Sequence, residues 1–153
     1  MNSIEEYWSA FLASQPADSP YHQKTYIAEA FGDGAALADK LGQLVVSGIK
    51  TGTCSSLWEW EAEENHIPEV GLITLVLDGA KQPICIIETT EVTICRFNEV
   101  DADFARAEGE GDLSLEYWRN AHKAYFSRNL PKIGKIFSED MPLVCERFKL
   151  IYK

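Results

Sequence analysis

Apolar side chains recur every three or four residues in several segments of the chain, which predicts amphipathic helices. The longer segments span residues 3–14, 35–47 and 114–129, and a shorter one spans 100–107. Gly48 directly follows the second segment, where a glycine is the usual C-terminal cap of a helix. The pattern therefore predicts a helix at the N-terminus and further helices in the middle and the C-terminal third of the chain.

Other segments have the continuous, β-branched apolar runs that are typical of strands. These runs cover residues 70–77, 83–97 and 141–152. The run 83–97 is long for a small domain, which indicates a strand that bends around a barrel. The order of elements predicts an α+β fold, a small, curved and mostly antiparallel β-barrel with flanking helices. Two segments fit a strand and a helix equally well: residues 25–31 and 53–60.

The 153 residues, 46% of them hydrophobic, suffice for one domain with a buried core. We expect residues 1–20 to form an N-terminal helix and connection that pack on a domain spanning 21–153. The chain has no apolar run of membrane-spanning length, and its first residues are acidic where a secretory signal would be basic. These features predict a cytoplasmic protein without a membrane partner.

The charge distribution narrows the choice of partner. The net charge of −10 disfavours long duplex DNA, because a polyanion needs local positive potential. Residues 119–153, however, hold eight Lys and Arg against three Asp and Glu. This segment could form a basic surface for a nucleoside or a short single strand of RNA. The four cysteines show neither a close pair nor metal-ligand spacing, which predicts reduced core thiols and no zinc site.

The segment Gly48-Ile49-Lys50-Thr51-Gly52-Thr53 places an amine and two hydroxyls between glycines. Glycines let a backbone approach a ligand closely, and exposed N–H groups in such a turn can hold an anion. A helix cap followed by an exposed lysine is the simpler interpretation. Lys50 and Thr53 are three residues apart, so on a regular strand they would face opposite sides. They can share a cleft only if the chain turns at Gly52.

A second cluster, Glu108-Gly109-Glu110-Gly111-Asp112, alternates three carboxylates with two glycines just before the helix at residue 114. Capping of that helix explains one of these residues. The spacing excludes an EF-hand calcium loop. One or two of the carboxylates could hold a magnesium or manganese ion, although no cofactor is required by the pattern.

Four motifs in this order resemble the ASCH domain, a member of the PUA-like β-barrel group, over roughly residues 26–153. They are the Gly48-x-Lys50-Thr51-x-Thr53 segment, the strand Ile87-Glu88-Thr89-Thr90-Glu91-Val92, the loop 108–112 and Tyr117-Trp118-Arg119-x-x-His122. The resemblance implies a domain that binds or acts on RNA. One branch of the family hydrolyses the acetyl amide of acetylated cytidine nucleosides, and another relative has been described as a ribonuclease.

Compared with the amidohydrolase branch, the resemblance implies that Lys50, Thr53 and Glu108 are catalytic, with Glu110 as an alternative acid. Thr53 would be the nucleophile, Lys50 its base, and Glu108 would protonate or position the leaving amine. Thr51 and the amides after it could stabilise the oxyanion. The remaining candidates for ligand binding are Gly48, Thr51, Gly52, Glu88, Glu110, Trp118, Arg119 and His122.

Some of these residues also have simpler interpretations. Glu88 would need a cation if buried, and Lys50 is one candidate partner. His122 lies on the apolar stripe of its helix, which favours a core or cleft-edge histidine over a catalytic one. The sequence thus predicts a cleft for RNA or a modified nucleoside, in a hydrolase or in a non-catalytic RNA-binding or regulatory module. A protein-interaction domain that uses Trp58, Trp60 and the acidic run after them is a further alternative.

Overall fold

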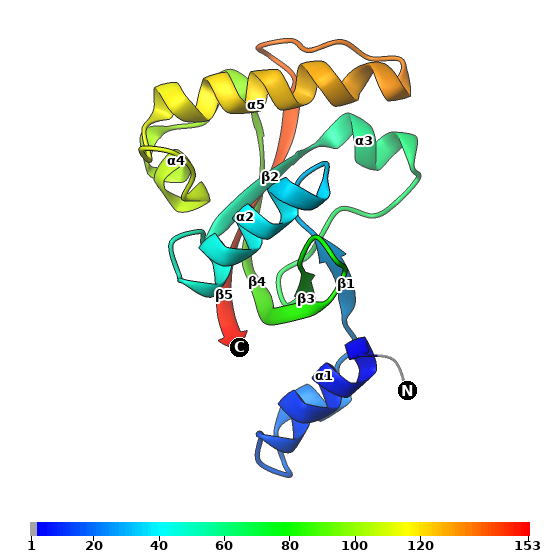
Figure 1. Ribbon diagram of the computed structural model, residues 1–153. Coiled ribbons are helices and arrows are strands. Elements are labelled where there is room, and N and C mark those ends of the chain that lie inside the picture. The colour runs from blue at the N-terminus through cyan, green and yellow to red at the C-terminus, as the bar shows by residue number, and fades with distance from the viewer. Residues whose placement is uncertain (1–2) are drawn as a thin grey trace.

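The structure is a computed structural model that describes residues 3–153 (Figure 1), so the first two residues of the predicted N-terminal segment lie outside the described part. The strands are β1 (Ile27–Ala30), β2 (Gly52–Ser56), β3 (Ile73–Leu77), β4 (Pro83–Arg96) and β5 (Pro142–Tyr152). The α-helices are α1 (Ser3–Ala13), α2 (Ala35–Val46), α3 (Leu57–Ala62), α4 (Ala102–Glu108) and α5 (Leu115–Asn129). Short 3-10 helices lie at Pro20–Gln23, Phe97–Glu99 and Leu130–Ile133.

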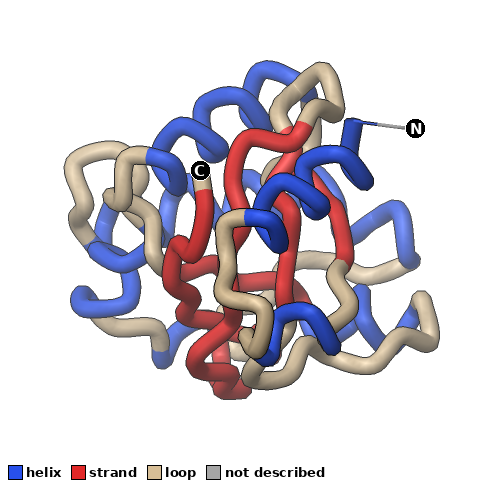
Figure 2. Tube along the Cα trace, turned by 90° about the horizontal axis from the view of Figure 1, so that it is seen from below, coloured by secondary structure: helices blue, strands red, loops and turns tan. Residues whose placement is uncertain are grey.

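The five strands form one curled sheet in the order β1-β3-β4-β5-β2. Figure 2 shows the strands in the middle of the molecule with helices around them. The long strand β4 pairs with β5 along its length, and its register shifts after Ile86 and after Thr89. Such irregularities bend a strand, so the predicted bent strand over 83–97 is confirmed. The α+β class and the curved sheet are confirmed as well.

The sheet differs from a closed antiparallel barrel in two respects. β1 pairs with β3 in parallel, whereas the other pairs are antiparallel. A parallel pair needs a long crossover, and here the chain passes through α2, β2 and α3 between the two strands. In the described residues β1 and β2 are the edges of the sheet. The result is a half-barrel.

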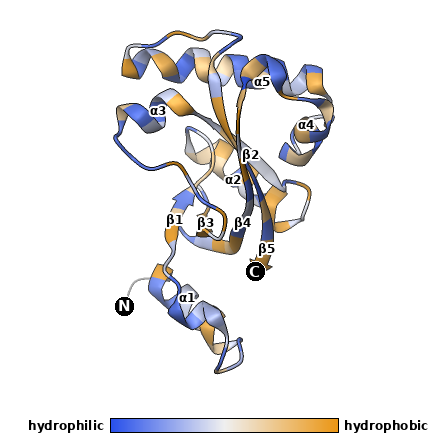
Figure 3. Cartoon of the chain, turned by 180° about the vertical axis from the view of Figure 1, so that it is seen from behind, coloured by the Kyte–Doolittle hydropathy of each residue, from blue (hydrophilic) through white to orange (hydrophobic). Residues whose placement is uncertain are grey.

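The helices pack their apolar stripes against this sheet. α1 buries Trp8 and Phe11 against Ile73, Leu75 and Ile86 of the sheet. α5 lies at the opposite end of the molecule (Figure 1), where its buried Trp118 and Phe126 belong to one core cluster with Phe104 of α4 and with Leu143 and Cys145 of β5. Hydrophilic and hydrophobic segments alternate along α5 in Figure 3, as expected for a helix with one buried face.

The sequence-based boundaries agree closely with the structure. The ambiguous segment 25–31 contains β1, and 53–60 contains β2 followed by α3 because the Ser56 hydroxyl caps the helix. Ser114 caps α5 by accepting a hydrogen bond from the Tyr117 amide. The division at residue 20 stays a prediction. No helix within residues 3–153 combines the length and apolarity needed to cross a membrane.

Candidate functional site

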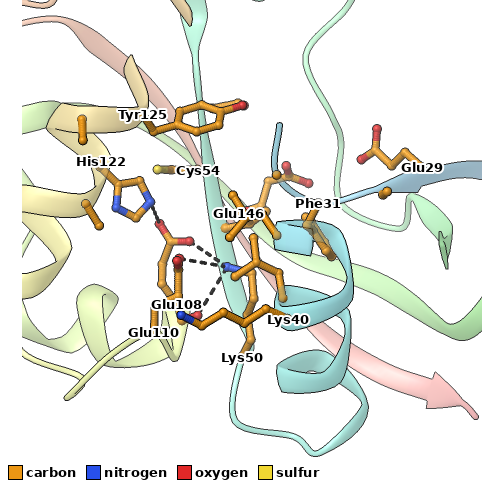
Figure 4. Close-up of a pocket in the computed structure, with 18 of the residues that line it drawn as sticks. Glu29, Phe31, Lys40, Lys50, Cys54, Glu108, Glu110, His122, Tyr125 and Glu146 are labelled. Atoms are coloured by element: carbon orange, nitrogen blue, oxygen red, sulfur yellow. Dashed lines mark hydrogen bonds and ion pairs between the residues drawn. The ribbon is translucent and has the colours of Figure 1, made fainter. Parts of the chain in front are cut away.

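A cavity of about 450 Å³ opens between the β1–α2 side of the molecule and the α4–α5 side. The residues lining it include Lys50, Thr53, Glu108, Glu110 and His122. Figure 4 shows the Lys50 amine between the two glutamates, with His122 on the far side of Glu108. The fold therefore brings together residues that are far apart in sequence and were predicted to act as a group.

Lys50 and Glu108 form a buried ion pair in this cavity. The Lys50 Nζ lies 2.8 Å from Glu108 Oε1, and both side chains are only 1% exposed. The same amine contacts the main-chain carbonyl oxygen of Glu108 at 3.3 Å and lies 3.9 Å from Glu110 Oε2. It also lies 5.6 Å from the centre of the Phe31 ring. A carboxylate at this distance stabilises the ammonium, so the geometry gives Lys50 a proton to donate. The sequence-based hypothesis had assigned it the role of base.

The second oxygen of Glu108 is held by two residues of α5. Oε2 accepts a hydrogen bond from Trp118 Nε1 at 2.8 Å and lies 3.1 Å from His122 Nε2. His122 Nδ1 is 2.9 Å from the Trp118 carbonyl oxygen, and the two rings stack with centres 4.3 Å apart. Because both imidazole nitrogens face acceptors, His122 satisfies this arrangement as an imidazolium.

These contacts decide the ionisation states of Glu108 and His122. Burial alone would raise the pKa of Glu108, but Lys50 and His122 outweigh it and hold that pKa well below its usual range. Burial alone would lower the pKa of His122, but Glu108 outweighs it and raises that pKa. The buried Glu108 carboxylate is thus kept ionised by donors on two sides.

The local sequence explains how Lys50 reaches Glu108. Gly109, at the C-terminal end of α4, has a left-handed φ of +76°, and a Cβ there would lie 2.8 Å from the Ile49 carbonyl oxygen. Glycine therefore permits both the turn and the close backbone approach. β2 begins only at Gly52, so Lys50 lies before the strand and strand alternation does not separate it from Thr53. The two residues line one cavity without a left-handed kink at Gly52.

The glycines and Thr51 of the same segment have structural contacts. The Thr51 amide and hydroxyl both donate to the Ala107 carbonyl oxygen, at 2.7 and 3.4 Å, and Thr51 is not among the cavity residues. A Cβ on Gly52 would lie 3.3 Å from the Ala107 Cβ, so this glycine packs against α4. Gly48 has a φ of +82° just after α2, as a helix-terminating glycine does.

The remaining predicted residues fall into two groups. Trp118 and His122 contact Glu108, as described above, whereas Arg119 is exposed on α5 and outside the cavity. Glu88 is outside the cavity as well, and it does not pair with Lys50, which was one candidate partner. Its partners are the Tyr21 hydroxyl and Lys24 on the N-terminal side of the sheet, because β4 directs it toward that segment.

Sequence reasoning missed an acidic end of the cavity. Glu29 on β1 and Glu146 on β5 both line it. Burial and the neighbouring Glu29 raise the pKa of Glu146 to about 7, although Thr89 donates a hydrogen bond to it. Burial also raises the pKa of Glu29. A signal existed for Glu146, since it lies two residues from the buried Val144 on the same face of the predicted strand 141–152.

The structure also shows which candidate metal ligands lie close together and which do not. The three carboxylates of 108–112 do not converge, because Glu108 contacts Lys50 and Asp112 accepts a hydrogen bond from the Ser114 amide. Cys54 of β2 was expected to be a core thiol, yet it lines the cavity. One donor atom each from Cys54, Glu108 and His122 lies within 4.8 Å of the other two.

Comparison with known proteins agrees with the fold and its sequence motifs. The ASCH domain family model matches residues 27–152. An ASCH domain from Lactobacillus crispatus JV V101 is 34% identical, with a TM-score of 0.92 over 99% of this chain and 95% of that one. Protein EF3133 from Enterococcus faecalis V583 is 38% identical, with a TM-score of 0.86 over 98% of this chain and 88% of that one. No curated protein matches the chain. The chain belongs to the ASCH domain family.

Proposed function

We propose that the cavity binds a nucleoside and hydrolyses an acetyl amide on its base, as in the amidohydrolase branch that the sequence resembles. The main support is that Lys50, Thr53 and Glu108 line one cavity, with the amine and the carboxylate 2.8 Å apart. Its volume of about 450 Å³ is in the range of small-molecule sites. Aromatic rings that could stack on a base also line it: Phe31, Trp60, Tyr117 and Tyr125.

The proposed reaction uses each member of the group once. The Thr53 hydroxyl attacks the amide carbonyl, and the ionised Glu108 takes the hydroxyl proton. The Lys50 ammonium donates a proton to the leaving amine, so cytidine departs and the acetyl group remains on Thr53. The 2.8 Å hydrogen bond then returns the proton from Glu108 to Lys50. Water hydrolyses the ester and releases acetate.

The charges around the cavity favour an uncharged ligand over a phosphodiester. Two of the three Lys and Arg residues that line it contact carboxylates: Lys50 contacts Glu108, and Arg128 lies 2.9 Å from an Asp33 oxygen. The third, Lys40, is exposed. Additional carboxyls line the acidic end of the cavity, which would repel a phosphate. A nucleoside therefore fits better than an RNA strand.

The test is to incubate the purified protein with acetylated cytidine and to measure cytidine and acetate by chromatography. We expect turnover by the wild type and none by Thr53→Ala. Thr51→Ala is the matched control, because its hydroxyl belongs to the same segment but contacts Ala107 outside the cavity. It should keep most of the wild-type rate.

Binding has to be measured beside turnover. Calorimetry with the same nucleoside should show that Thr53→Ala still binds, because the hydroxyl is needed for the chemical step. Binding without turnover by the wild type would contradict the hydrolase proposal and favour the non-catalytic module. Cleavage of RNA in a parallel incubation, with no action on the nucleoside, would replace it with the ribonuclease alternative.

A further inference from the structure

Cys54 lies at the Glu108 end of the cavity, and the proposed hydrolysis does not use its thiol. In the described part of the chain, Cys54, Glu108 and His122 are the one group of three His, Cys, Asp or Glu residues whose donor atoms converge within 4.8 Å. All three line the cavity. We propose that they form a binding site for a zinc ion or a similar thiophilic divalent cation.

One pair of donor atoms is already close to the separation that one ion requires, and the Cys54 sulfur lies within 4.8 Å of both. Zinc–ligand bonds of about 2.0–2.3 Å place the ligand atoms of a tetrahedral site roughly 3.3–3.6 Å apart. His122 Nε2 and Glu108 Oε2 are already 3.1 Å apart. His122 Nδ1 faces the Trp118 carbonyl oxygen at 2.9 Å, so Nε2 is the nitrogen that remains for a metal. Zinc-binding histidines usually have such a backbone partner on the other nitrogen.

The charge balance also permits an ion of charge +2. Without metal, the neutral thiol of Cys54, the Glu108 carboxylate, the His122 imidazolium and the Lys50 ammonium sum to about +1. With zinc, the thiol and the imidazolium each lose a proton and the ion adds two charges, so the sum is again about +1. The buried site thus exchanges two protons for one cation without a change in net charge.

The donor set selects the class of metal. A thiolate and an imidazole favour zinc over magnesium, which prefers oxygen ligands. Three protein ligands leave a fourth position that faces the cavity, as in sites where zinc holds a water or a ligand. The sequence did not reveal this set, because residues 54, 108 and 122 lie on β2, α4 and α5.

Cobalt(II) provides a test that does not depend on turnover. The full chain is treated with a chelator, dialysed and titrated with cobalt(II) under anaerobic conditions. We expect one equivalent to produce visible tetrahedral d–d bands and a near-ultraviolet thiolate-to-cobalt band, and zinc to abolish both. Cys54→Ser should lose the thiolate band, whereas the matched control Cys95→Ala should keep it, because Cys95 contacts Cys145 and does not line the cavity.

His122→Gln provides a second variant that leaves the thiol in place. It should weaken zinc binding by at least about 10-fold, measured by competition with a chromophoric chelator. Circular dichroism confirms that each variant is folded. Absence of stoichiometric cobalt binding by the wild type, or a thiolate band that persists in folded Cys54→Ser, would overturn the proposal. Either result would leave the nucleoside hydrolysis to be judged on its own assay.

Discussion

Glu108 and Glu146 line the same cavity but differ in ionisation. Glu108 receives hydrogen bonds from Lys50 and Trp118 and faces His122, and its pKa is held below the usual range. Glu146 has one weak donor, the Thr89 hydroxyl at 3.4 Å, and a second carboxyl nearby. Its pKa is raised to about 7. The two side chains are chemically identical, but Glu108 is buried whereas Glu146 is half-buried.

Burial raises the pKa of both carboxyls, and only at Glu108 do the cationic partners outweigh it. At neutral pH the cavity without a ligand has an ionised carboxylate at one end. At the other end it has a carboxyl that can both donate and accept hydrogen bonds. This asymmetry suits a ligand that is attacked at one end and recognised at the other. The following predictions test it, with a chelator present so that no metal contributes.

The largest effect is expected from Lys50→Met, which removes one partner of the buried carboxylate. Breaking such a pair leaves an uncompensated charge and costs about 3–5 kcal/mol of unfolding free energy. Urea denaturation at pH 7 measures this loss. The double variant Lys50→Met/Glu108→Gln should recover most of it, because the carboxylate is gone and burial then favours the neutral form of His122. If the single and double variants are destabilised equally, the loss of stability does not come from leaving the Glu108 carboxylate without its partner.

The next effect concerns the pH dependence of stability at the other end of the cavity. The pKa of Glu146 is raised from 4.5 to about 7 in the folded protein. The protonated Glu146 carboxyl therefore stabilises the fold fully below pH 4.5, and this stabilisation is lost as the pH rises through 7. Between these limits the wild type should lose up to about 3 kcal/mol relative to Glu146→Gln, less where water reaches the carboxyl.

Urea denaturation of both proteins from about pH 4 to about pH 8.5, a range that begins below the unfolded pKa of Glu146 and ends above its folded pKa, checks this sign. Subtracting one curve from the other cancels the contribution of His122, which both proteins contain. Glu116→Gln, on the exposed side of α5, should run parallel to the wild type. If the wild type instead loses stability relative to Glu146→Gln as the pH falls, the pKa of Glu146 is lowered by folding and the assignment is wrong.

A smaller effect is expected at Gly109, which allows the approach of Lys50 to Glu108. Gly109→Ala combines a left-handed φ of +76° with a 2.8 Å contact to the Ile49 carbonyl oxygen, and strain of this kind costs about 1–3 kcal/mol. Gly134→Ala is a matched control, because Gly134 has the same φ and open space around it. The excess destabilisation of Gly109→Ala isolates the contact. If the two variants are equal, the contact has no role.

The smallest effect is expected at Ser114, which caps the helix that supplies the α5 partners of Glu108. Ser114→Ala should cost about 1 kcal/mol in unfolding free energy, because the Tyr117 amide loses its acceptor. Ser127→Ala, exposed in the same helix, should change it far less. Thermal unfolding of the three proteins provides the comparison, and equal stability of all three would exclude the cap.

The sequence predicted those features that are set by local patterns. The long bent strand 83–97 and the order of the assigned strands and helices follow from periodicity and turn residues. The grouping of Lys50, Thr53 and Glu108 was implied by the resemblance to the ASCH domain and was not read from local patterns.

The features that were missed depend on tertiary register. Glu29 lies in a segment that fitted helix and strand equally and is exposed on β1, so its place in the cavity lining could not be inferred. Cys54 looked like a small core residue, because its neighbours Glu108 and His122 are far away in sequence. The partner of Glu88 was misjudged because the contact with Tyr21 depends on how the N-terminal segment packs on β4.

Carbon NMR of the glutamate carboxyl groups tests the contrast between the two ends of the cavity most directly. Protein with labelled side-chain carboxyl carbons is titrated with chelator present, and the signals are assigned from Glu108→Gln and Glu146→Gln. We expect the Glu146 carboxyl to titrate near pH 7 and the Glu108 carboxyl to stay ionised below its usual range. If Glu108 instead takes up a proton near neutral pH while Glu146 behaves as an ordinary surface carboxyl, the account is contradicted.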